Sequence, residues 1–327
     1  MLPLSVVVPT FNRRARLARV LKALDQQHTP PAQYEVVVVD DGSTDGTSDW
    51  LRRERPSYTL RQLSLPNGGP ARARNAGVEA AVGNLILFID DDVEPLPELL
   101  AEHLAAHRVE PDVVVIGPLG SLPHYSQPWV AWEQAKVESQ YEAMTRGDWA
   151  PTFRQFWTGN ASVSRRHLQE AGLFDPSYLR AEDIELGIRL HQQGLKFRFN
   201  ARARALHHAE RSLSSWENMH ASYGRHEVAI FAKLGEPQML EILRENWNRL
   251  HPVMRALVGF CLNKPRRHSV LCAALRADLK LAERAGIQIA TEPVCSVLAS
   301  LLYWQASFDT LGPARAEHVL TWSRYGR

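Results

Sequence analysis

Short apolar runs alternate with amphipathic segments over the first ninety residues. Residues 4–8, 36–39 and 85–89 are almost purely apolar, which predicts strands buried on both faces. Residues 13–27 and 71–82 carry apolar side chains at helical spacing instead. Continuous apolar strands separated by helices predict a mostly parallel sheet covered by helices on both faces, so the expected fold class is α/β.

The pattern after about residue 215 is helical throughout, with helices expected at 216–234, 237–250, 252–262, 270–285 and 293–311. We therefore expect two domains, 1–214 and 215–327, of which the second is all-helical. The apolar stretch 294–308 is too short to span a bilayer and predicts a buried helix. Residues 138–151 mix polar and turn residues, which predicts a mobile loop.

Polar side chains follow three of the predicted strands. Thr10 ends the first strand, Asp40 and Asp41 follow the second, and the aspartate triplet 90–92 follows the strand at 85–89. Parallel strands bind ligands at their carboxyl ends, so these residues are expected to meet at one edge. Adjacent buried carboxylates are costly, whereas a hard divalent cation prefers oxygen ligands. The edge is therefore predicted to hold a metal; simple capping of strand-to-helix turns is the alternative.

Composition and motifs narrow the class of protein. With 45% hydrophobic and 23% charged residues the chain looks globular, and a net charge of +2 gives no reason to expect nucleic acid. The first strand is not preceded by a charged-then-apolar leader, which predicts a cytoplasmic protein. The three cysteines have no zinc or redox spacing and are expected to be buried and reduced: Cys261, Cys272 and Cys295. Dinucleotide and P-loop glycine motifs are absent, which disfavours oxidoreductases and P-loop enzymes.

Several short motifs occur in a characteristic order. They are Pro-Thr-Phe-Asn-Arg at 9–13, Val-Asp-Asp-Gly-Ser-Thr-Asp at 39–45, Gly-Pro-Ala-Arg-Ala-Arg-Asn-Ala-Gly at 69–77, Phe-Ile-Asp-Asp-Asp at 88–92, Thr-Gly-Asn-Ala at 158–161 and Glu-Asp-Ile-Glu-Leu-Gly-Ile-Arg at 182–189. The ordered set resembles the family 2 glycosyltransferases, which have the GT-A fold. The resemblance covers roughly residues 3–212, and no family motif follows residue 215.

The resemblance implies a nucleoside pocket lined by residues after the first two strands: Pro9, Thr10, Asn12 and Asp41. Asp41 would accept the N3–H of a pyrimidine base. Asp40 either shares this pocket or only caps the turn before Ser43.

The implied diphosphate side begins with Arg74, which would lie near the base or the phosphates, with Arg72 as the competing arginine. Asp90 would contact the ribose or the metal. Asp91, the middle residue of the triplet, is assigned to the donor side in a supporting role.

The resemblance also implies a divalent cation, Mn²⁺ or Mg²⁺, bound directly by Asp92. His207, expected at the end of a short strand, would be a second ligand. His208 or Arg211 could instead touch the diphosphate, and which of the two histidines binds metal stays open.

Catalysis in this family is an inverting displacement that needs one carboxylate as general base. The resemblance assigns that role to Asp183, with Glu182 and Glu185 as competitors. Arg189 follows Glu185 at i+4, so a structural ion pair is the favoured interpretation for Glu185. The acceptor side would be formed by an aromatic ring, an amide and a carboxylate: Trp157, Asn160 and Glu182.

The expected activity is metal-dependent inverting transfer of a sugar, from UDP- or dTDP-sugar, to a glycan or lipid-linked hydroxyl acceptor, as in polysaccharide biosynthesis. The alternatives are a sugar-1-phosphate nucleotidyltransferase and a catalytically silent glycan-binding or assembly protein. Residues 253–262 and the basic cluster at 264–268 could contact the inner face of a membrane peripherally, although a helical subdomain with its basic loop in water is favoured.

Overall fold

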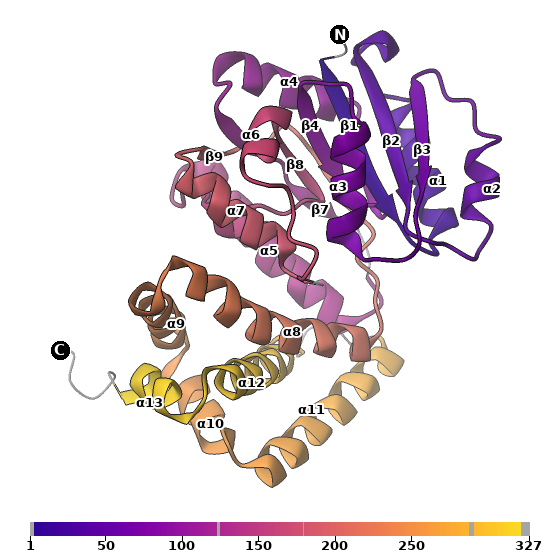
Figure 1. Ribbon diagram of the computed structural model, residues 1–327. Coiled ribbons are helices and arrows are strands. Elements are labelled where there is room, and N and C mark those ends of the chain that lie inside the picture. Colours follow the sequence, from indigo (N-terminus) through magenta and orange to yellow (C-terminus); the bar gives the residue numbers. More distant parts are fainter. Residues whose placement is uncertain (1–2, 123–124, 179, 288–290, 322–327) are drawn as a thin grey trace. The chain divides into compact units, whose positions relative to one another are not determined.

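The computed structural model describes residues 3–122, 125–178, 180–287 and 291–321. The chain divides into two compact units (Figure 1). The first, here called the sheet unit, comprises Met1–Leu122 and Lys136–Ala209. The second, the helical unit, comprises Pro123–Ala135 and Glu210–Arg327.

The sheet unit is built on a sheet whose described strands number seven, in the order β3-β2-β1-β4-β8-β6-β9. The strands β1, β2, β3 and β4 are mutually parallel, and β9 is parallel to β6. Only β8 runs antiparallel to its neighbours, β4 and β6. The predicted mostly parallel sheet is confirmed. The bounds are β1 Leu4–Thr10, β2 Tyr34–Asp40, β3 Thr59–Ser64, β4 Leu85–Ile89, β6 Val113–Ile116, β8 Asn160–Ser164 and β9 Lys196–Phe199.

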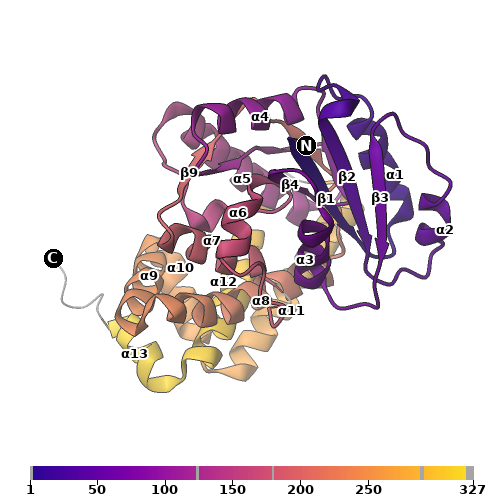
Figure 2. The same cartoon turned by 45° about the horizontal axis from the view of Figure 1, so that its top comes forward.

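Helices cover both faces of this sheet, as predicted (Figures 1 and 2). On one face, α1 (Arg14–Leu24) and α4 (Leu99–Val109) pack on side chains such as Val6 and Val8. The other face carries α3 (Pro70–Ala80), α6 (Arg165–Glu170) and α7 (Glu182–Gln192), which pack on side chains such as Val7. Alternate residues of β1 thus enter opposite cores, as the pleat of a strand requires.

A second, three-stranded sheet in the order β5-β10-β7 lies in the same unit. Its strands are β5 (Val93–Pro95), β7 (Leu119–Ser121) and β10 (Ala205–His207). The antiparallel register places His207 opposite Val93, directly after the aspartate triplet. The prediction that His207 ends a short strand is therefore confirmed, and the small sheet carries this histidine to the strand-end edge.

The predicted mobile loop at 138–151 is largely wrong, because a long helix, α5 (Pro128–Arg146), runs through most of it. Tyr141 and Met144 lie on one side of this helix and are buried, so tertiary packing outweighs the mixed polarity of the segment. Irregular structure is confined to residues 147–152.

The helical unit contains every helix expected after residue 215, each within a few residues of its predicted limits. The apolar stretch 294–308 is confirmed as a buried helix, and the three cysteines are buried and free. In the described part of the chain, no helix is long and apolar enough to cross a bilayer. The bounds are α8 Leu213–Phe231, α9 Glu236–Arg249, α10 Pro252–Cys261, α11 Pro265–Ala285, α12 Glu292–Leu311 and the unexpected α13 Pro313–Thr321.

Candidate active site

The carboxyl ends of β1 and β4 meet through a buried hydrogen bond. Thr10 Oγ1 donates to Asp91 Oδ2 at 2.8 Å, and both side chains are almost inaccessible. Burial raises the pKa of Asp91 to about 6, although the Arg13 guanidinium opposes the shift. The middle aspartate of the triplet therefore belongs to the interior of the strand-end edge rather than to its surface.

Two arginines that the sequence reasoning did not single out hold the outer part of the triplet. Arg13 Nη1 donates to Asp91 Oδ1 at 3.0 Å and to Asp92 Oδ2 at 2.9 Å. Arg16 Nη1 donates to the same Asp92 oxygen at 3.2 Å. Residues three apart at a helix start share a face. That spacing, directly after the first strand, is the signal that could have identified both arginines.

His207 and His208 point to different carboxylates. His207 Nε2 lies 3.8 Å from Asp92 Oδ1, whereas His208 Nε2 lies 3.1 Å from Glu94 Oε2. The His208 backbone N–H also donates to the Asp92 carbonyl at 2.9 Å. The structure therefore brings His207, and not His208, beside the carboxylate expected to bind metal.

The donor set at Asp92 fits a cation that takes only part of its shell from protein. Asp92 and His207 offer one oxygen and one nitrogen, which suits Mn²⁺ or Mg²⁺ completed by water and phosphate oxygens. Among the described residues there is no group of three or more His, Cys, Asp or Glu side chains that could hold a metal ion by itself. Arg13 and Arg16 compete for the same carboxylate.

Arg74 is buried between two carboxylates. Its Nη1 donates to Glu182 Oε1 at 2.6 Å, and its Nη2 donates to Asp90 Oδ1 at 2.8 Å. Arg72, the competing candidate, is exposed. Arg74 thereby ties the end of β4 to the start of α7, which joins the donor-side aspartates to the predicted catalytic helix.

Asp183 lies in the first turn of α7, next to this buried ion pair. Burial raises the pKa of its carboxyl, the charge of Glu182 raises it further, and Arg74 lowers it. The raised pKa brings the carboxyl closer to the range in which a general base works near neutral pH.

Glu185, the other competitor, is fully buried and committed to an ion pair. Its two oxygens accept from Arg189 Nε at 3.0 Å and Nη2 at 2.5 Å. The structural pair predicted from the i+4 spacing is confirmed. A carboxylate held in this way has no free approach to an acceptor hydroxyl.

The loops after β1, β2 and β3 are tied together by side chains predicted to line the nucleoside pocket. Asp41 accepts from the backbone N–H groups of Gly68 at 2.9 Å and Gly69 at 2.8 Å. Asn12 Oδ1 accepts from the Thr44 N–H at 2.7 Å. These contacts give the pocket residues a positioning role that the motifs alone did not indicate.

Two further residues of these strands, Asp40 and Pro9, serve the local backbone structure. Asp40 Oδ1 accepts from the Ser43 N–H at 2.9 Å, so the capping alternative for Asp40 is confirmed. Pro9 lies within β1, paired with Val39, one residue before the strand end.

Asn160 is buried in β8 and does not reach the strand-end surface. Its Oδ1 bonds to His103 Nε2 at 2.9 Å, and its Nδ2 donates to the carbonyl oxygens of Ala203 at 2.8 Å and Pro118 at 3.2 Å. A sugar hydroxyl would have to displace these partners at the cost of a buried polar group. The expectation of an acceptor contact for Asn160 is therefore corrected: this amide supports the sheet.

The segment preceding Asn160 does lie beside the aspartates. A side chain added at Gly159 would place its Cβ 3.3 Å from Asp90 Oδ2, so the missing side chain leaves the carboxylate open. Trp157 is partly exposed, and its ring meets Tyr141 edge-on at 5.9 Å. Trp157 precedes Gly159 by two residues and is packed in part against α5.

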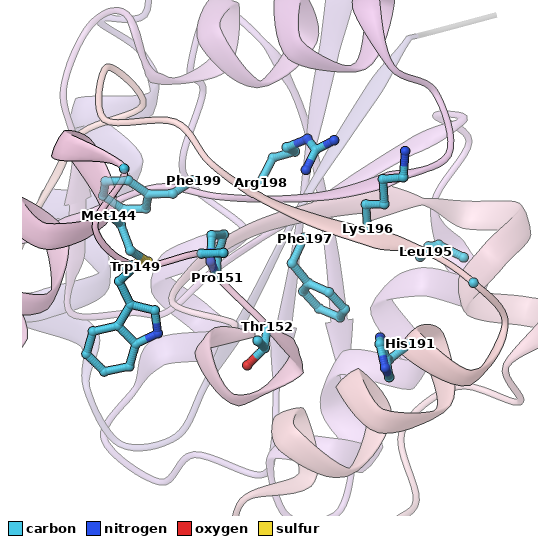
Figure 3. Close-up of a pocket in the computed structure, with 13 residues that line it drawn as sticks. Met144, Trp149, Pro151, Thr152, His191, Leu195, Lys196, Phe197, Arg198 and Phe199 are labelled. Carbon is cyan, nitrogen blue, oxygen red and sulfur yellow. The ribbon is translucent and has the colours of Figure 1, made fainter.

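A separate pocket of about 550 Å³ lies at the far end of α7, between β9 and residues 147–152 (Figure 3). In the close-up, Phe197 and Thr152 lie on one side of β9, while Lys196 and Arg198 extend from the other. No residue predicted for the donor, metal or acceptor lines it. The pocket is therefore distinct from the strand-end site.

Comparison with known proteins identifies the family. Residues 5–172, about half of the chain, match the sequence model "Glycosyl transferase family 2". The chain belongs to glycosyl transferase family 2.

Among curated family relatives, the uncharacterized glycosyltransferase YfnE of Bacillus subtilis is 30% identical over 243 residues, which cover 59% of this chain and 62% of YfnE. Validoxylamine A glucosyltransferase of Streptomyces hygroscopicus subsp. limoneus is 34% identical over 223 residues, covering 59% of this chain and 48% of the relative. The chain thus spans between about half and three fifths of the length of these relatives.

Solved structures show the same fold at low identity. The mannosyltransferase PcManGT from Pyrobaculum calidifontis, in complex with GDP-Man and Mn²⁺, matches with a TM-score of 0.61 at 20% identity, covering 93% of this chain and 87% of PcManGT. Staphylococcus aureus TarS 1–349, in complex with UDP-GlcNAc, matches with a TM-score of 0.56 at 20% identity, covering 90% of this chain and 91% of TarS 1–349. The predicted family and the GT-A-like α/β fold with a helical C-terminal region are confirmed.

Proposed function

We propose that this family 2 protein is an inverting glycosyltransferase that moves a sugar from a nucleotide-sugar donor to a hydroxyl group of a glycan or lipid-linked acceptor. The observation that carries the proposal is the buried link from Asp90 through Arg74 to Glu182, beside Asp183. This link supports the proposal because it joins the strand-end aspartates to a carboxyl whose pKa is raised.

In this proposal the donor lies across the strand ends, with its nucleoside against the loops held by Asn12 and Asp41. Arg13 and Arg16 are close enough to the triplet to neutralise a diphosphate as well as Asp92. Positive charge at the leaving group stabilises the negative charge that develops there during transfer.

Asp183 is the proposed general base. Its carboxylate takes the proton of the acceptor hydroxyl as the oxygen bonds to the anomeric carbon, and the bond from that carbon to the diphosphate oxygen breaks. Attack from the face opposite the leaving group inverts the anomeric configuration. Glu182 and Arg74 set the charge around Asp183, and the partly exposed Trp157 offers an aromatic ring on which an acceptor sugar can stack.

Asp92 and His207 are the residues that would hold Mn²⁺ or Mg²⁺. A divalent cation there supplies charge neutralisation to the leaving nucleoside diphosphate. PcManGT was solved with GDP-Man and Mn²⁺, which supports a divalent cation in this proposal.

Neutralising Asp183 tests the proposal most simply. Asp183→Asn keeps the side-chain shape but is a far weaker base, so turnover should fall about 10²–10⁴-fold while donor affinity changes little. Turnover is measured as nucleoside diphosphate released from a panel of nucleotide sugars, and affinity by calorimetry. Asp148→Asn, which neutralises an exposed aspartate outside the site, is the matched control.

Three outcomes would contradict the proposal. Undiminished turnover in folded Asp183→Asn would show that Asp183 is not the general base. Absence of any diphosphate release by the native protein would favour the catalytically silent glycan-binding protein. Release of pyrophosphate from a nucleoside triphosphate and a sugar-1-phosphate would instead identify a nucleotidyltransferase.

A further inference from the structure

The helical unit exposes a concentration of large hydrophobic side chains on α10, on α11 and just after α11. Among the residues that the structure describes, eight such side chains are exposed, and five of them lie between residues 253 and 287. They are Val253 (69% exposed), Phe260 (58%), Val270 (71%), Leu281 (65%) and Ile287 (52%). Single exposed hydrophobic residues are ordinary, but a cluster of this kind indicates a surface that meets a partner.

The spacing of these residues makes a continuous stripe on each helix. On α10, Val253, Ala256 and Phe260 are exposed at i, i+3 and i+7, whereas Val258 and Cys261 are buried. Helix α10 is therefore apolar both toward the interior of its unit and toward its surroundings.

The next helix repeats the pattern. On α11, Val270, Ala273, Ala277 and Leu281 are exposed at i, i+3, i+7 and i+11 and so share one face. Figure 1 shows α10 passing directly into α11 through a short connection. Beside that connection, Arg267 lies over the Phe260 ring with its guanidinium carbon 4.3 Å from the ring centroid, so the end of the α10 stripe contacts the basic start of α11.

The first part of this segment, residues 251–277, is biased in charge, whereas the exposed Asp278 and Glu283 lie beside Leu281 near the end of α11. Residues 251–277 contain no Asp or Glu, although 36 acidic residues in 327 would place about three there by average. Their basic residues are Arg255, Lys264, Arg266, Arg267 and Arg276. Lys264 and Arg266 are exposed at the start of α11 and form no ion pair with any described residue.

We propose that this surface, made of the two apolar stripes with Lys264, Arg266 and Arg267, docks on an anionic lipid bilayer. The apolar side chains would enter the boundary between headgroups and acyl chains, and the basic residues would contact anionic headgroups. A second copy of the chain is the less suitable occupant, because a symmetric contact would bring two acid-free basic clusters together. The inference is independent of the proposed chemistry.

Vesicle co-sedimentation of the full chain tests the docking surface. The probe is vesicles of phosphatidylcholine and phosphatidylglycerol in equal parts, compared with vesicles of phosphatidylcholine alone. The native protein should bind the mixed vesicles and bind the neutral ones weakly, and added salt should weaken the binding to mixed vesicles. Val253→Ser with Phe260→Ser should lower partitioning at least tenfold, which is about the contribution of burying such side chains. Lys264→Glu with Arg266→Glu should lower it about tenfold on mixed vesicles only.

Matched controls lie next to each other on α4 and its C-terminal end. Val109→Ser removes an apolar side chain that is even more exposed, at 87%, and Arg108→Glu reverses an exposed charge; neither should change partitioning. Circular dichroism and thermal unfolding establish that each variant is folded. Equal binding of mixed and neutral vesicles, or variants that bind like the native protein, would overturn the proposal. Light scattering gives a further contrary outcome. If the native protein is a dimer that does not bind vesicles, and Val253→Ser with Phe260→Ser dissociates that dimer, the surface contacts a second copy of the chain instead of a bilayer.

Discussion

The charge around Asp183 is set by two neighbours with opposite effects. Glu182 raises the pKa of the Asp183 carboxyl in addition to the effect of burial, and Arg74 lowers it. Glu182 also accepts a hydrogen bond from Arg74, which holds the arginine beside the start of α7. In the Glu-Asp pair, Glu182 therefore helps to set the pKa of the proposed base, Asp183.

A pH profile tests this tuning. A general base acts when deprotonated, so turnover should rise with pH through the raised pKa of Asp183 and then level off. Glu182→Gln removes the repelling charge while Asp90 still holds Arg74 nearby, so the apparent pKa of that rise should fall by about one unit. The measurement is diphosphate release across pH for both proteins. An unchanged or higher apparent pKa in Glu182→Gln would contradict this account.

At the residue scale, Asp41 is also the residue expected to select the nucleobase of the donor. Its carboxylate already accepts from Gly68 and Gly69, yet a carboxylate has lone pairs for a further donor. Uracil and thymine offer an N3–H that cytosine lacks, so UDP and dTDP should bind more tightly than CDP by about 1–3 kcal/mol. Calorimetric titration of the three nucleotides decides this. Equal affinities would remove Asp41 from base recognition, and a preference for GDP would point to a different donor.

At the scale of elements, close packing of α3 on the sheet positions Arg74. Gly77 lies one turn after Arg74 on this helix, and a Cβ there would stand 2.4 Å from Val7 Cγ1 and 3.3 Å from Val39 Cγ2. The helix can approach β1 and β2 only because residue 77 has no side chain. The glycine therefore helps to set the depth at which Arg74 meets Asp90 and Glu182.

Paired glycine substitutions test this packing. Gly77→Ala should lower the free energy of unfolding by about 1–3 kcal/mol, the usual cost of overpacking. Gly259→Ala, also within a helix but with nothing near its added Cβ, should raise stability by about 0.5–1 kcal/mol. Thermal unfolding of both variants is the measurement. If Gly77→Ala were as stable as the native protein, the close approach would be wrong.

The elements differ in how far the sequence could predict them. The strands ending at Thr10, Asp40 and Ile89 were predictable because continuous apolar runs and following polar residues are local signals. The antiparallel insertion of β8 and the burial of Asn160 depend on contacts with His103 and Ala203. Those partners are distant in sequence, and no local pattern encodes them. The helix through residues 138–146 was missed for the same reason: its stability comes from burial of Tyr141.

At the scale of the whole molecule, the predicted family, fold and strand-end edge follow from motifs in order along the chain. The partners of the triplet do not follow from these motifs. Arg13 and Arg16 contact Asp92 because the start of α1 brings both side chains to the end of β4, although the two arginines precede Asp92 by 79 and 76 residues in sequence. The proposed nucleotide-sugar site depends above all on Asp92 and His207, which would bind the cation that neutralises the donor diphosphate.

Stabilisation by nucleotide and metal tests that claim most directly. Thermal unfolding is followed with UDP, with Mn²⁺, and with both, for the native protein and for Asp92→Asn. We expect UDP to stabilise the native protein and Mn²⁺ to add to this effect. In Asp92→Asn the added effect should be lost, and a hundredfold weaker affinity corresponds to about 2.7 kcal/mol at saturating ligand. Asp148→Asn should behave like the native protein. Metal-enhanced stabilisation that persists in Asp92→Asn, or a native protein that no nucleoside diphosphate stabilises, would contradict the account.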